Sequence, residues 1–509
     1  TNYIHRVVRG RKISGTIFFQ GGTAYNDAVA AAFSQILDRE IIVPPYNGVV
    51  GAVGAALLAW DRMDRVGGRT RFRGWDLGQV RYQTREIACR ACENRCDVQE
   101  FQVEGERSYW GDQCGDRFRT SRRTEFTPLL DDLVRLRREW TLDGYDPSPG
   151  RRGLVAFPRA LYFHERFPYW QAFFRELGLG VILTPETNRE LIQQGIEAAV
   201  AEPCFPIQIA HGHARAAAEH AKADFVFLPN MVNAEASHEA IESFYCPWGM
   251  TLPHVVKSSP VLEGHAGRII HPILRFRGGR EAIARALREP LRPYGIRARE
   301  ISRALLAAEA AADRFAARVR NGGITAMRLL RESGEKAIVL VGRPYNLYDP
   351  AASLDVARKL RARFGVNVVP MEFLAASQDD LEAINSNLFW GYGRRIVAAA
   401  RAAGAWDNLN IIYVTNFKCG PDSFIKPFAR DAFGRPMLTL QFDGHANDAG
   451  MMTRVEAFLH SQGMLRGEDP PPTGRRRPGD RAVAAEAGTC EGTLAGGCAT
   501  CVSAPLRRK

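Results

Sequence analysis

The 509-residue sequence lacks any uninterrupted apolar run near the ~20 residues that a membrane-spanning helix needs, and it lacks a signal-peptide pattern. Its formal net charge of +12 comes mostly from arginines that are scattered through helical stretches. A dense block of basic residues interleaved with aromatics, which would favour nucleic-acid binding, is missing. We therefore expect a cytoplasmic protein that binds neither membranes nor nucleic acids.

Cysteines are too sparse for a disulfide scaffold, since the chain has ten of them in 509 residues. Four lie within residues 89–114, three stand alone at positions 204, 246 and 419, and three lie in the tail beyond residue 466. This uneven grouping suits a reducing compartment and metal ligation better than disulfide bridges.

The composition, 46% apolar and 24% charged, is typical of a globular chain, and the length is enough for roughly three domains. The sequence begins at Thr1, without methionine and within a motif, so we expect a fragment of a longer protein. Beyond residue 466 the chain has Pro, Gly, Arg and Ala but almost no large apolar side chains. We expect residues 466–509 to be a disordered tail or a translation out of frame, because they cannot bury a core.

Residues 1–65 run through strand, glycine turn and helix twice. Gly21 and Gly22 lie between an apolar strand at 17–19 and a helix expected to begin near Asn26. Such a turn can bring the backbone close to a phosphate or an adenosine, and tight packing explains a Gly-Gly pair equally well. In the second turn, GVVGAVGAA, the small residues have the spacing that lets a helix lie close to a sheet.

From residue 150 onward, short apolar strands alternate with amphipathic helices. The strand candidates are LVAF, VILT, AAVA and FVFLP, followed by AIVLVG, VNVVP, IIYVT and LTLQF. This alternation predicts an α/β fold with two lobes, each a parallel sheet with helices on both faces. We place the lobes at residues 150–275 and 335–465, joined by a helical connection at 276–334.

A four-cysteine pattern, C-x2-C-x3-C-x17-C, occupies the segment 66–125 that precedes the lobes. Its members are Cys89, Cys92, Cys96 and Cys114. Apolar and polar residues alternate around Glu104-Gly105, which predicts a hairpin that returns the fourth cysteine to the other three. Four thiolates suit zinc, which would stabilise a small module without a core, or an iron–sulfur cluster. Free structural cysteines are the third interpretation.

The three lone cysteines share a local pattern. Cys204 lies in EPCFP, Cys246 in YCPW and Cys419 in KCGP. Two of the three, Cys204 and Cys419, come at the end of an expected strand. A proline one or two residues later removes an N–H donor and fixes a turn, so we expect each sulfur to be presented at that turn rather than packed into a helix. Three such thiolates, converging from two lobes, would hold three irons of a cubane and leave the fourth iron open. Three separate buried cysteines are the plainer alternative.

Other polar residues near these cysteines are candidates for proton transfer. Glu202 lies beside Cys204, and His445 follows the last expected strand. His211 and His213 stand at positions i and i+2 of an expected helix, so they do not share a face and are unsuited to bind one metal together. The further candidates are Asp443 and Asp448.

Many segments, in order, carry a resemblance to a known family. IFFQGGTAYNDAVAAAF and VPPYNGVVGAVGAALLAW resemble the last subdomain of the activator ATPases of 2-hydroxyacyl-CoA dehydratases and benzoyl-CoA reductases, which have an actin-like fold. CRACENRCDVQEF, PRALYFHERFPYWQAFFRELG, AEPCFPIQIAHGH, FLPNMVN, GRPYNLYDP and TNFKCGPDSF resemble the large activase-related fusions. In those proteins such an ATPase precedes a region akin to the iron–sulfur dehydratase subunits. The resemblance covers roughly residues 1–465.

The resemblance implies that residues 1–65 are the C-terminal part of an activator-type ATPase domain, with Gly21 and Gly22 near the nucleotide. It implies that Cys204, Cys246 and Cys419 hold a [4Fe-4S] or larger iron–sulfur cluster. The phosphate-binding part of the ATPase and the cysteines that bridge its dimer have no counterpart in this sequence, so we expect ATP binding only together with the missing portion. The implied partners are an activator ATPase, fused or separate, an acyl-CoA substrate and a second copy of the chain.

The leading hypothesis is therefore an oxygen-sensitive iron–sulfur protein of the 2-hydroxyacyl-CoA dehydratase/activase type. It would accept low-potential electrons from ATP-driven activation and pass them to a small substrate, with acyl-CoA as the implied class. The alternative is a non-catalytic, zinc-stabilised scaffold that docks a partner ATPase, in which the three cysteines are merely buried. A third hypothesis, an ATP-binding regulator acting through residues 1–65, predicts nucleotide affinity in this chain.

Overall fold

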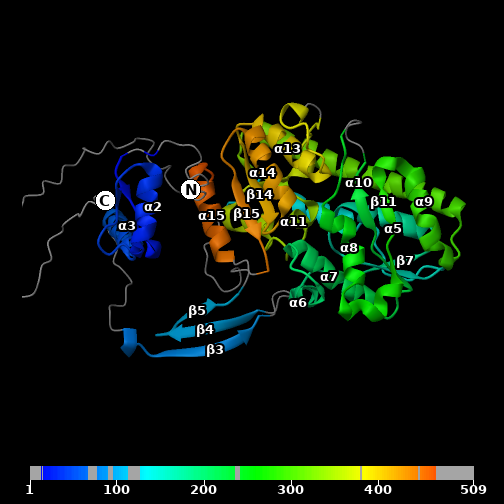
Figure 1. The fold of residues 1–509 in the computed structure, drawn as a ribbon, viewed down its shortest axis with the longest axis horizontal. Coiled ribbons are helices and arrows are strands. Elements are labelled where there is room, and N and C mark those ends of the chain that lie inside the picture. The colour runs from blue at the N-terminus through cyan, green and yellow to red at the C-terminus, as the bar shows by residue number, and fades with distance from the viewer. Residues whose placement is uncertain are drawn as a thin grey trace, which may run out of the picture. The chain divides into compact units, whose positions relative to one another are not determined.

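The structure, a computed structural model, describes residues 13, 15–66, 77–89, 96–112, 126–235, 241–378, 381–444 and 448–465. It divides into two compact units, Thr1–Gln83 with Val103–Glu106 and Thr84–Gln102 with Arg107–Lys509. Parallel strands alternate with helices along most of the second unit (Figure 1), so the predicted α/β class is confirmed.

The first unit is built from two short strands and the helices beside them. Its elements are β1 (Ile17–Phe18), a 3-10 helix (Gly22–Tyr25), α2 (Asp27–Leu37), β2 (Ile41–Ile42), α3 (Val50–Val66) and a 3-10 helix (Leu77–Gln79). Helix α2 begins where the sequence predicts, because the Asn26 side chain accepts a hydrogen bond of 3.0 Å from the N–H of Ala28. A Cβ placed on Gly48, shortly before α3, would stand 2.6 Å from the hydroxyl oxygen of Tyr25, whereas among the described residues nothing lies within 4 Å of one placed on Gly51 or Gly54. Within the described part of the chain, close packing therefore explains Gly48 but not Gly51 or Gly54.

A three-stranded sheet flanks two cysteines of the four-cysteine pattern, Cys89 directly after its first strand and Cys96 directly before its second. Its strands are β3 (Tyr82–Ala88), β4 (Asp97–Val103) and β5 (Glu106–Trp110), in the order β3-β4-β5. The expected turn is present between β4 and β5, where Glu104 and Gly105 have φ angles of 49° and 86°. The glycine suits this turn because it adopts positive φ without a steric penalty.

The first lobe is a four-stranded parallel sheet of order β10-β8-β6-β7 with its helices. Its elements are β6 (Leu154–Phe157), α5 (Phe163–Glu176), β7 (Gly180–Leu183), α6 (Arg189–Ala198), α7 (Phe205–Ala218), β8 (Phe225–Phe227), β9 (Asn230–Asn233), α8 (Pro247–Lys257), a 3-10 helix (Pro260–Arg268), β10 (Ile269–Ile270), β11 (Ile273–Arg275), a 3-10 helix (Phe276–Gly278) and α9 (Gly279–Leu291). The preceding helix α4 (Leu133–Thr141) packs on α5 and contributes Leu133 and Val134 to the core of the second lobe. Aromatic side chains of α5 pack on β6 and β8, with Trp170 and Phe227 rings 4.7 Å apart.

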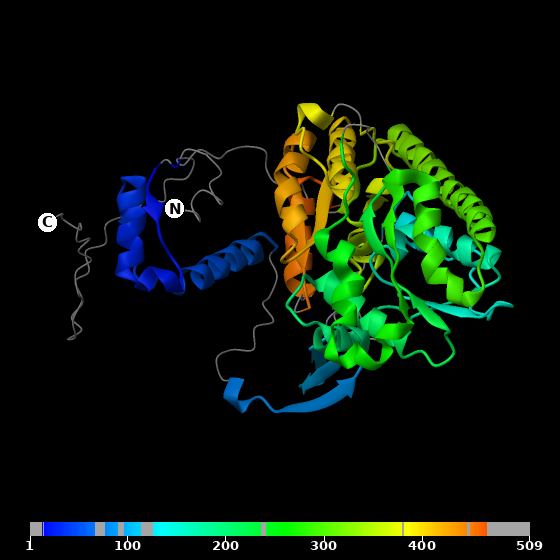
Figure 2. The same ribbon diagram turned by 45° about the vertical axis from the view of Figure 1, so that its right-hand side comes forward.

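The second lobe is a four-stranded parallel sheet of order β13-β12-β14-β15. Its elements are β12 (Ala337–Gly342), α11 (Pro344–Tyr348), α12 (Val356–Phe364), β13 (Asn367–Pro370), 3-10 helices (Met371–Phe373 and Leu381–Ala383), α13 (Gly391–Gly404), β14 (Leu409–Asn416), α14 (Gly420–Phe433), β15 (Leu438–Phe442) and α15 (Asp448–Ser461). Every residue of β12 and β14 is buried, as expected for central strands covered on both faces. Figure 2 shows this sheet between its helices.

Between the lobes in sequence lies the long helix α10 (Ala298–Ser333), which packs against α5 and against the segment Met371–Phe373. At its start the N–H of Arg297 donates to Oε2 of Glu300 at 3.0 Å, which pairs one backbone donor at the helix N-terminus. A Cβ on Gly323 would stand 1.9 Å from the carbonyl oxygen of Phe373, so glycine is required for this close approach.

One predicted strand is wrong. Residues 198–201 (AAVA) contain the end of α6 instead, because Leu191, Gly195 and Ala198 form one buried face of that helix. Residues 466–509, expected to be a disordered tail, lie outside the described residues, and the domain boundaries stay predictions. Among the helices that the structure describes, none combines the length and the apolar character needed to cross a bilayer.

Candidate functional site

The three lone cysteines occupy the same kind of position. Cys204, Cys246 and Cys419 are the residues immediately before α7, α8 and α14, and no side-chain hydrogen bond engages them as caps. Each helix has a proline within its first two residues. Proline is common at the start of a helix because its fixed φ suits helical backbone and because the first N–H groups have no partner within the helix.

The expectation that two of the cysteines end a strand is therefore wrong for one of them. Cys419 does follow a strand, β14, but Cys204 comes after the end of α6. Cys246 lies two residues after Phe244, which makes isolated bridges to Asn233 and Trp390. The prolines begin helices rather than merely fixing turns. Nevertheless the sulfurs are not buried inside a helical face, because each precedes its helix.

All three cysteines line one cavity of about 360 Å³. Cys204 and Cys246 come from the first lobe and Cys419 comes from the second, and no disulfide joins them. Among the residues that the structure describes, no group of three or more His, Cys, Asp and Glu side chains is arranged to hold a metal ion. The cysteines thus share a cavity without the close grouping of a single-ion site.

Burial sets the protonation of two of these thiols. It raises the pKa of Cys204 to about 11, with a further contribution from neighbouring Cys246. It also raises the pKa of Cys419 to about 12, and Asp422 adds to this increase. Both side chains are therefore neutral thiols near pH 7 in the absence of a ligand.

A buried ion pair lies beside the cysteines. Arg343, at the end of β12, donates from Nε to Oδ1 of Asp422 at 2.8 Å, and the two side chains are 1% and 2% exposed. Thr415 donates to the other oxygen of Asp422 at 2.5 Å. Arg343 and Asn416 also line the cysteine cavity, and sequence analysis missed both. The proline after Arg343 signals the start of a helix in the sequence. The ion pair of Arg343 could not be predicted in this way, because Asp422 lies far along the chain.

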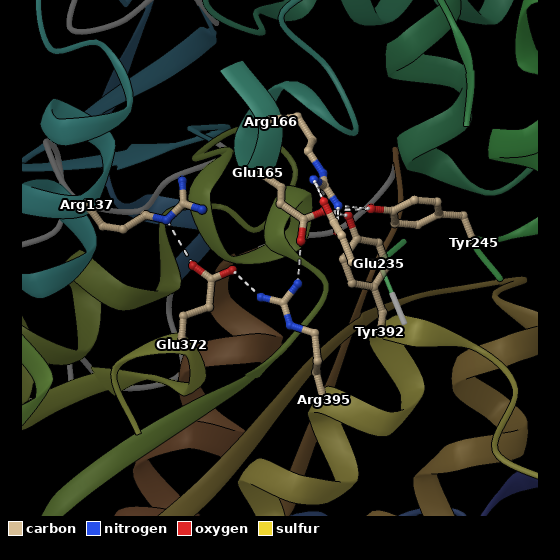
Figure 3. Close-up of polar contacts among 8 residues, drawn as sticks. All are labelled: Arg137, Glu165, Arg166, Glu235, Tyr245, Glu372, Tyr392 and Arg395. Carbon is tan, nitrogen blue, oxygen red and sulfur yellow. Dashed lines mark hydrogen bonds and ion pairs between the residues drawn. The ribbon is translucent and has the colours of Figure 1, made fainter. Parts of the chain in front are cut away.

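A second network connects the two lobes through Glu165 of α5 (Figure 3). Tyr392 and Tyr245 donate to Oε2 of Glu165 at 2.7 Å and 3.2 Å, and Arg395 pairs with its other oxygen. Burial disfavours the charge on Glu165, but Arg395, Arg166 and the Tyr392 hydroxyl outweigh it and hold the pKa at about 2. Glu165 is therefore a carboxylate at all ordinary pH values.

The same network continues to Glu372. Arg395 and Arg137 donate to its two oxygens, each at 2.9 Å. Glu165, Glu372 and Arg395 line a larger cavity of about 1220 Å³ beside α10, whereas Tyr392 lines the cysteine cavity. The hydrogen bond between Tyr392 and Glu165 thus links the walls of the two cavities.

The proton-transfer candidates lie in different surroundings. Glu202 is 86% exposed and pairs with Lys418, a cavity-lining residue, at 2.8 Å, and this hydrogen bond lowers its pKa. His213 is buried between the hydroxyls of Thr184 and Thr187, at 2.6 Å and 2.9 Å. Burial lowers its pKa to about 3, so it is a neutral, hydrogen-bonded core residue.

The remaining candidates are placed as follows. His211 is buried, with Nδ1 2.8 Å from the carbonyl oxygen of Ile207. Asp443 follows β15 and is half-buried. His445 lies outside the described residues, and of Asp448 only its backbone, at the start of α15, is described.

The structure describes two members of the four-cysteine pattern, Cys89 and Cys96. Cys89 and Cys96 are buried, and the N–H of Cys89 donates to the carbonyl oxygen of Cys96 at 2.8 Å. Cys92 and Cys114 lie outside the described residues, so the four-cysteine module is not confirmed. In the first unit, Gly21 has φ 99°, and among the described residues no atom lies within 4 Å of a Cβ placed on Gly21 or Gly22. A nucleotide near this pair stays a prediction.

Residues 154–374 match the family model described as "CoA enzyme activase uncharacterised domain (DUF2229)". This match relates the chain to activase-type proteins. The matched region contains Cys204, Cys246 and Arg343 but ends before Cys419. No curated protein matches the sequence.

Proposed function

We propose that the chain is the iron–sulfur component of a 2-hydroxyacyl-CoA dehydratase/activase-type system. It would accept low-potential electrons from an ATP-driven activator and pass them to a small substrate of the acyl-CoA class. The observation that carries the proposal is the convergence of Cys204, Cys246 and Cys419, from both lobes, on one cavity. The match to a CoA enzyme activase domain supports the type of system.

The residues of the cavity suit an anionic cluster. Cys204, Cys246 and Cys419 precede three helices, whose N-termini direct positive partial charge toward the sulfurs. A single metal ion, with bonds of about 2.3 Å to each sulfur, needs the sulfurs close together. A cubane gives each cysteine its own iron and so accepts a wider arrangement of the three sulfurs. When bound through three cysteines, such a cluster supplies an open iron and one-electron chemistry.

The chain's own residues then have defined tasks. The thiols of Cys204 and Cys419 must lose their protons to become ligands, so loading the site releases protons. Tyr392, held by Glu165, forms part of the cavity wall, and the buried pair of Arg343 and Asp422 fixes a cation beside the sulfurs.

The test is metal analysis after anaerobic purification and reconstitution. We expect a brown protein with about four irons and four sulfides for each cubane. Cys204→Ala, Cys246→Ala and Cys419→Ala should each lose most of this iron, while the control Cys490→Ser, outside the described residues, should retain it. Unchanged iron in Cys419→Ala would overturn the assignment of this ligand.

A zinc-braced docking scaffold is the second candidate. It is favoured by one observation, the backbone pairing of buried Cys89 and Cys96, which brings two cysteines of the four-cysteine pattern together. This scaffold predicts about one zinc and no iron per chain, and Cys89→Ala should release that zinc.

A further inference from the structure

Two residues that line the cysteine cavity have a buried nitrogen donor without a hydrogen-bond partner in the described part of the chain. The donors are Nη2 of Arg343 and Nδ2 of Asn416. Both residues line the cavity and are 1% and 3% exposed. Buried donors are nearly always paired, and leaving one unpaired is costly, above all on a charged group. The two donors therefore indicate an acceptor that the cavity is built to receive.

The guanidinium of Arg343 is held in a fixed orientation. Its Nε is bound to Asp422, and the second oxygen of Asp422 is occupied by Thr415. One edge of the guanidinium is thus anchored while Nη2 has no hydrogen-bond partner among the described residues. The five N–H donors of a guanidinium lie in one rigid plane, so the anchored edge also fixes the direction of Nη2. Asn416, the last residue of β14, adds an amide donor from the neighbouring strand.

The charge of the cavity favours a negative ligand. The helices α7, α8 and α14 begin at the three cysteines that line it, so their positive ends face this region. Asp422 is neutralised by Arg343, and the exposed Glu202 is paired with Lys418, which lines the cavity. No unpaired carboxylate of the described residues lines the cavity.

We propose that Arg343 and Asn416 bind the negatively charged oxygens of a small carboxylate, placing that carboxylate beside the three cysteines. The volume, about 360 Å³, is at the lower end of the range of ligand pockets, and Ile207, Trp248 and Trp390 supply apolar walls for a short carbon chain. Binding of the anion requires no cluster. The inference rests on the proposed function only for a later reaction of the bound carboxylate at the cluster.

The experiment uses two alkylating reagents of similar size on the full chain with reduced thiols. Iodoacetate carries a carboxylate and iodoacetamide is neutral, and both react with the thiolate, which displaces iodide. The thiolate fraction of a given cysteine affects both rates equally, so it cancels in the ratio of the two rates. The ratio therefore reports how strongly the site attracts the anionic reagent. We measure it at Cys204, Cys246 and Cys419 by peptide mass spectrometry, with the same cysteines in the urea-unfolded chain as reference.

We expect the ratio of the iodoacetate rate to the iodoacetamide rate to be at least about tenfold higher in the folded chain at one or more of these cysteines, and to fall when acetate is added. Arg343→Gln and Asn416→Asp should each reduce the ratio about tenfold, the effect of one lost charge-assisted hydrogen bond. The controls are Arg137→Gln, another buried arginine with a carboxylate partner, and Asn410→Asp, at the other end of β14.

A folded-chain ratio no higher than that of the unfolded chain would overturn the inference. A wild-type ratio in a folded Asn416→Asp variant would also overturn it, and this variant decides the question if Arg343→Gln does not fold. The inference would equally be overturned if Arg137→Gln lowered the ratio as much as Arg343→Gln does. A raised ratio in a chain that binds no iron would support the anion site while rejecting the iron–sulfur function. Iron bound by a chain without the raised ratio would support the iron–sulfur function while rejecting the anion site.

Discussion

The hydroxyl of Tyr392 donates a hydrogen bond of 2.7 Å to Oε2 of Glu165. Tyr392 belongs to α13 of the second lobe, and Glu165 belongs to α5 of the first. Since Tyr392 lines the cysteine cavity, the wall of that cavity depends on a carboxylate that belongs to the other lobe.

Tyr392→Phe should lower the free energy of unfolding by about 1.5–3 kcal/mol, because it removes a buried hydrogen bond to a charged acceptor. The measurement is urea unfolding followed by circular dichroism. Tyr169→Phe is the matched control, since the Tyr169 side chain is buried in α5 and its hydroxyl has no hydrogen-bond partner among the described residues. An equal loss in both variants would show that the contact with Glu165 is not the cause.

Glu165 predicts a pH dependence of stability. Its pKa is about 2 in the folded chain, below the ordinary value of 4.5, so it stabilises the fold above pH 4.5 and this contribution is lost as the pH falls toward 2. The full effect is on the order of 3 kcal/mol. Glu165→Gln should therefore be less stable than the wild type at pH 7, and the difference should shrink between pH 4.5 and pH 2. A difference independent of pH in this window would contradict the assignment.

Gly323→Ala should destabilise the chain although alanine is the better helix former by about 1 kcal/mol. The added Cβ would meet the carbonyl oxygen of Phe373, so α10 or the segment Met371–Phe373 must shift, at a net cost of about 1–3 kcal/mol. Thr325→Ala, at an exposed position of the same helix, should be neutral or slightly stabilising. Thermal unfolding compares the two, and a stabilised Gly323→Ala would contradict the packing.

Glu202→Gln should leave the unfolding midpoint and the iron content unchanged. The carboxylate is exposed and its ion pair with Lys418 is a surface pair, which contributes little to stability. Its lowered pKa makes it a poor proton donor near pH 7. A loss of iron in this variant would show that the pair with Lys418 helps to close the cysteine site.

The sequence predicted the parts of the fold that depend on local pattern. The buried strands β6, β12 and β14 are short apolar runs between turn signals, and such runs identify central parallel strands. The AAVA prediction is wrong because only Ala198, its first residue, belongs to the buried face of α6, and the other three follow the helix. The prolines after the cysteines were compatible with a turn and with the first turn of a helix, and only the residues after each proline decide between the two.

The site was predictable only in part for the same reason. Cysteines can be recognised from sequence by their type and spacing, and the structure brings three of them to one cavity. The roles of Arg343 and Glu165 could not be found this way, because arginine and glutamate are common and their pairing with Asp422 and Arg395 arises only when distant segments pack together.

The most direct test is anomalous X-ray diffraction at the iron absorption edge, on crystals grown anaerobically from the reconstituted chain. Our account predicts an iron cluster in the cavity, bonded to the sulfurs of Cys204, Cys246 and Cys419. A cavity without iron, or iron held elsewhere while these three sulfurs remain unbound, would contradict it.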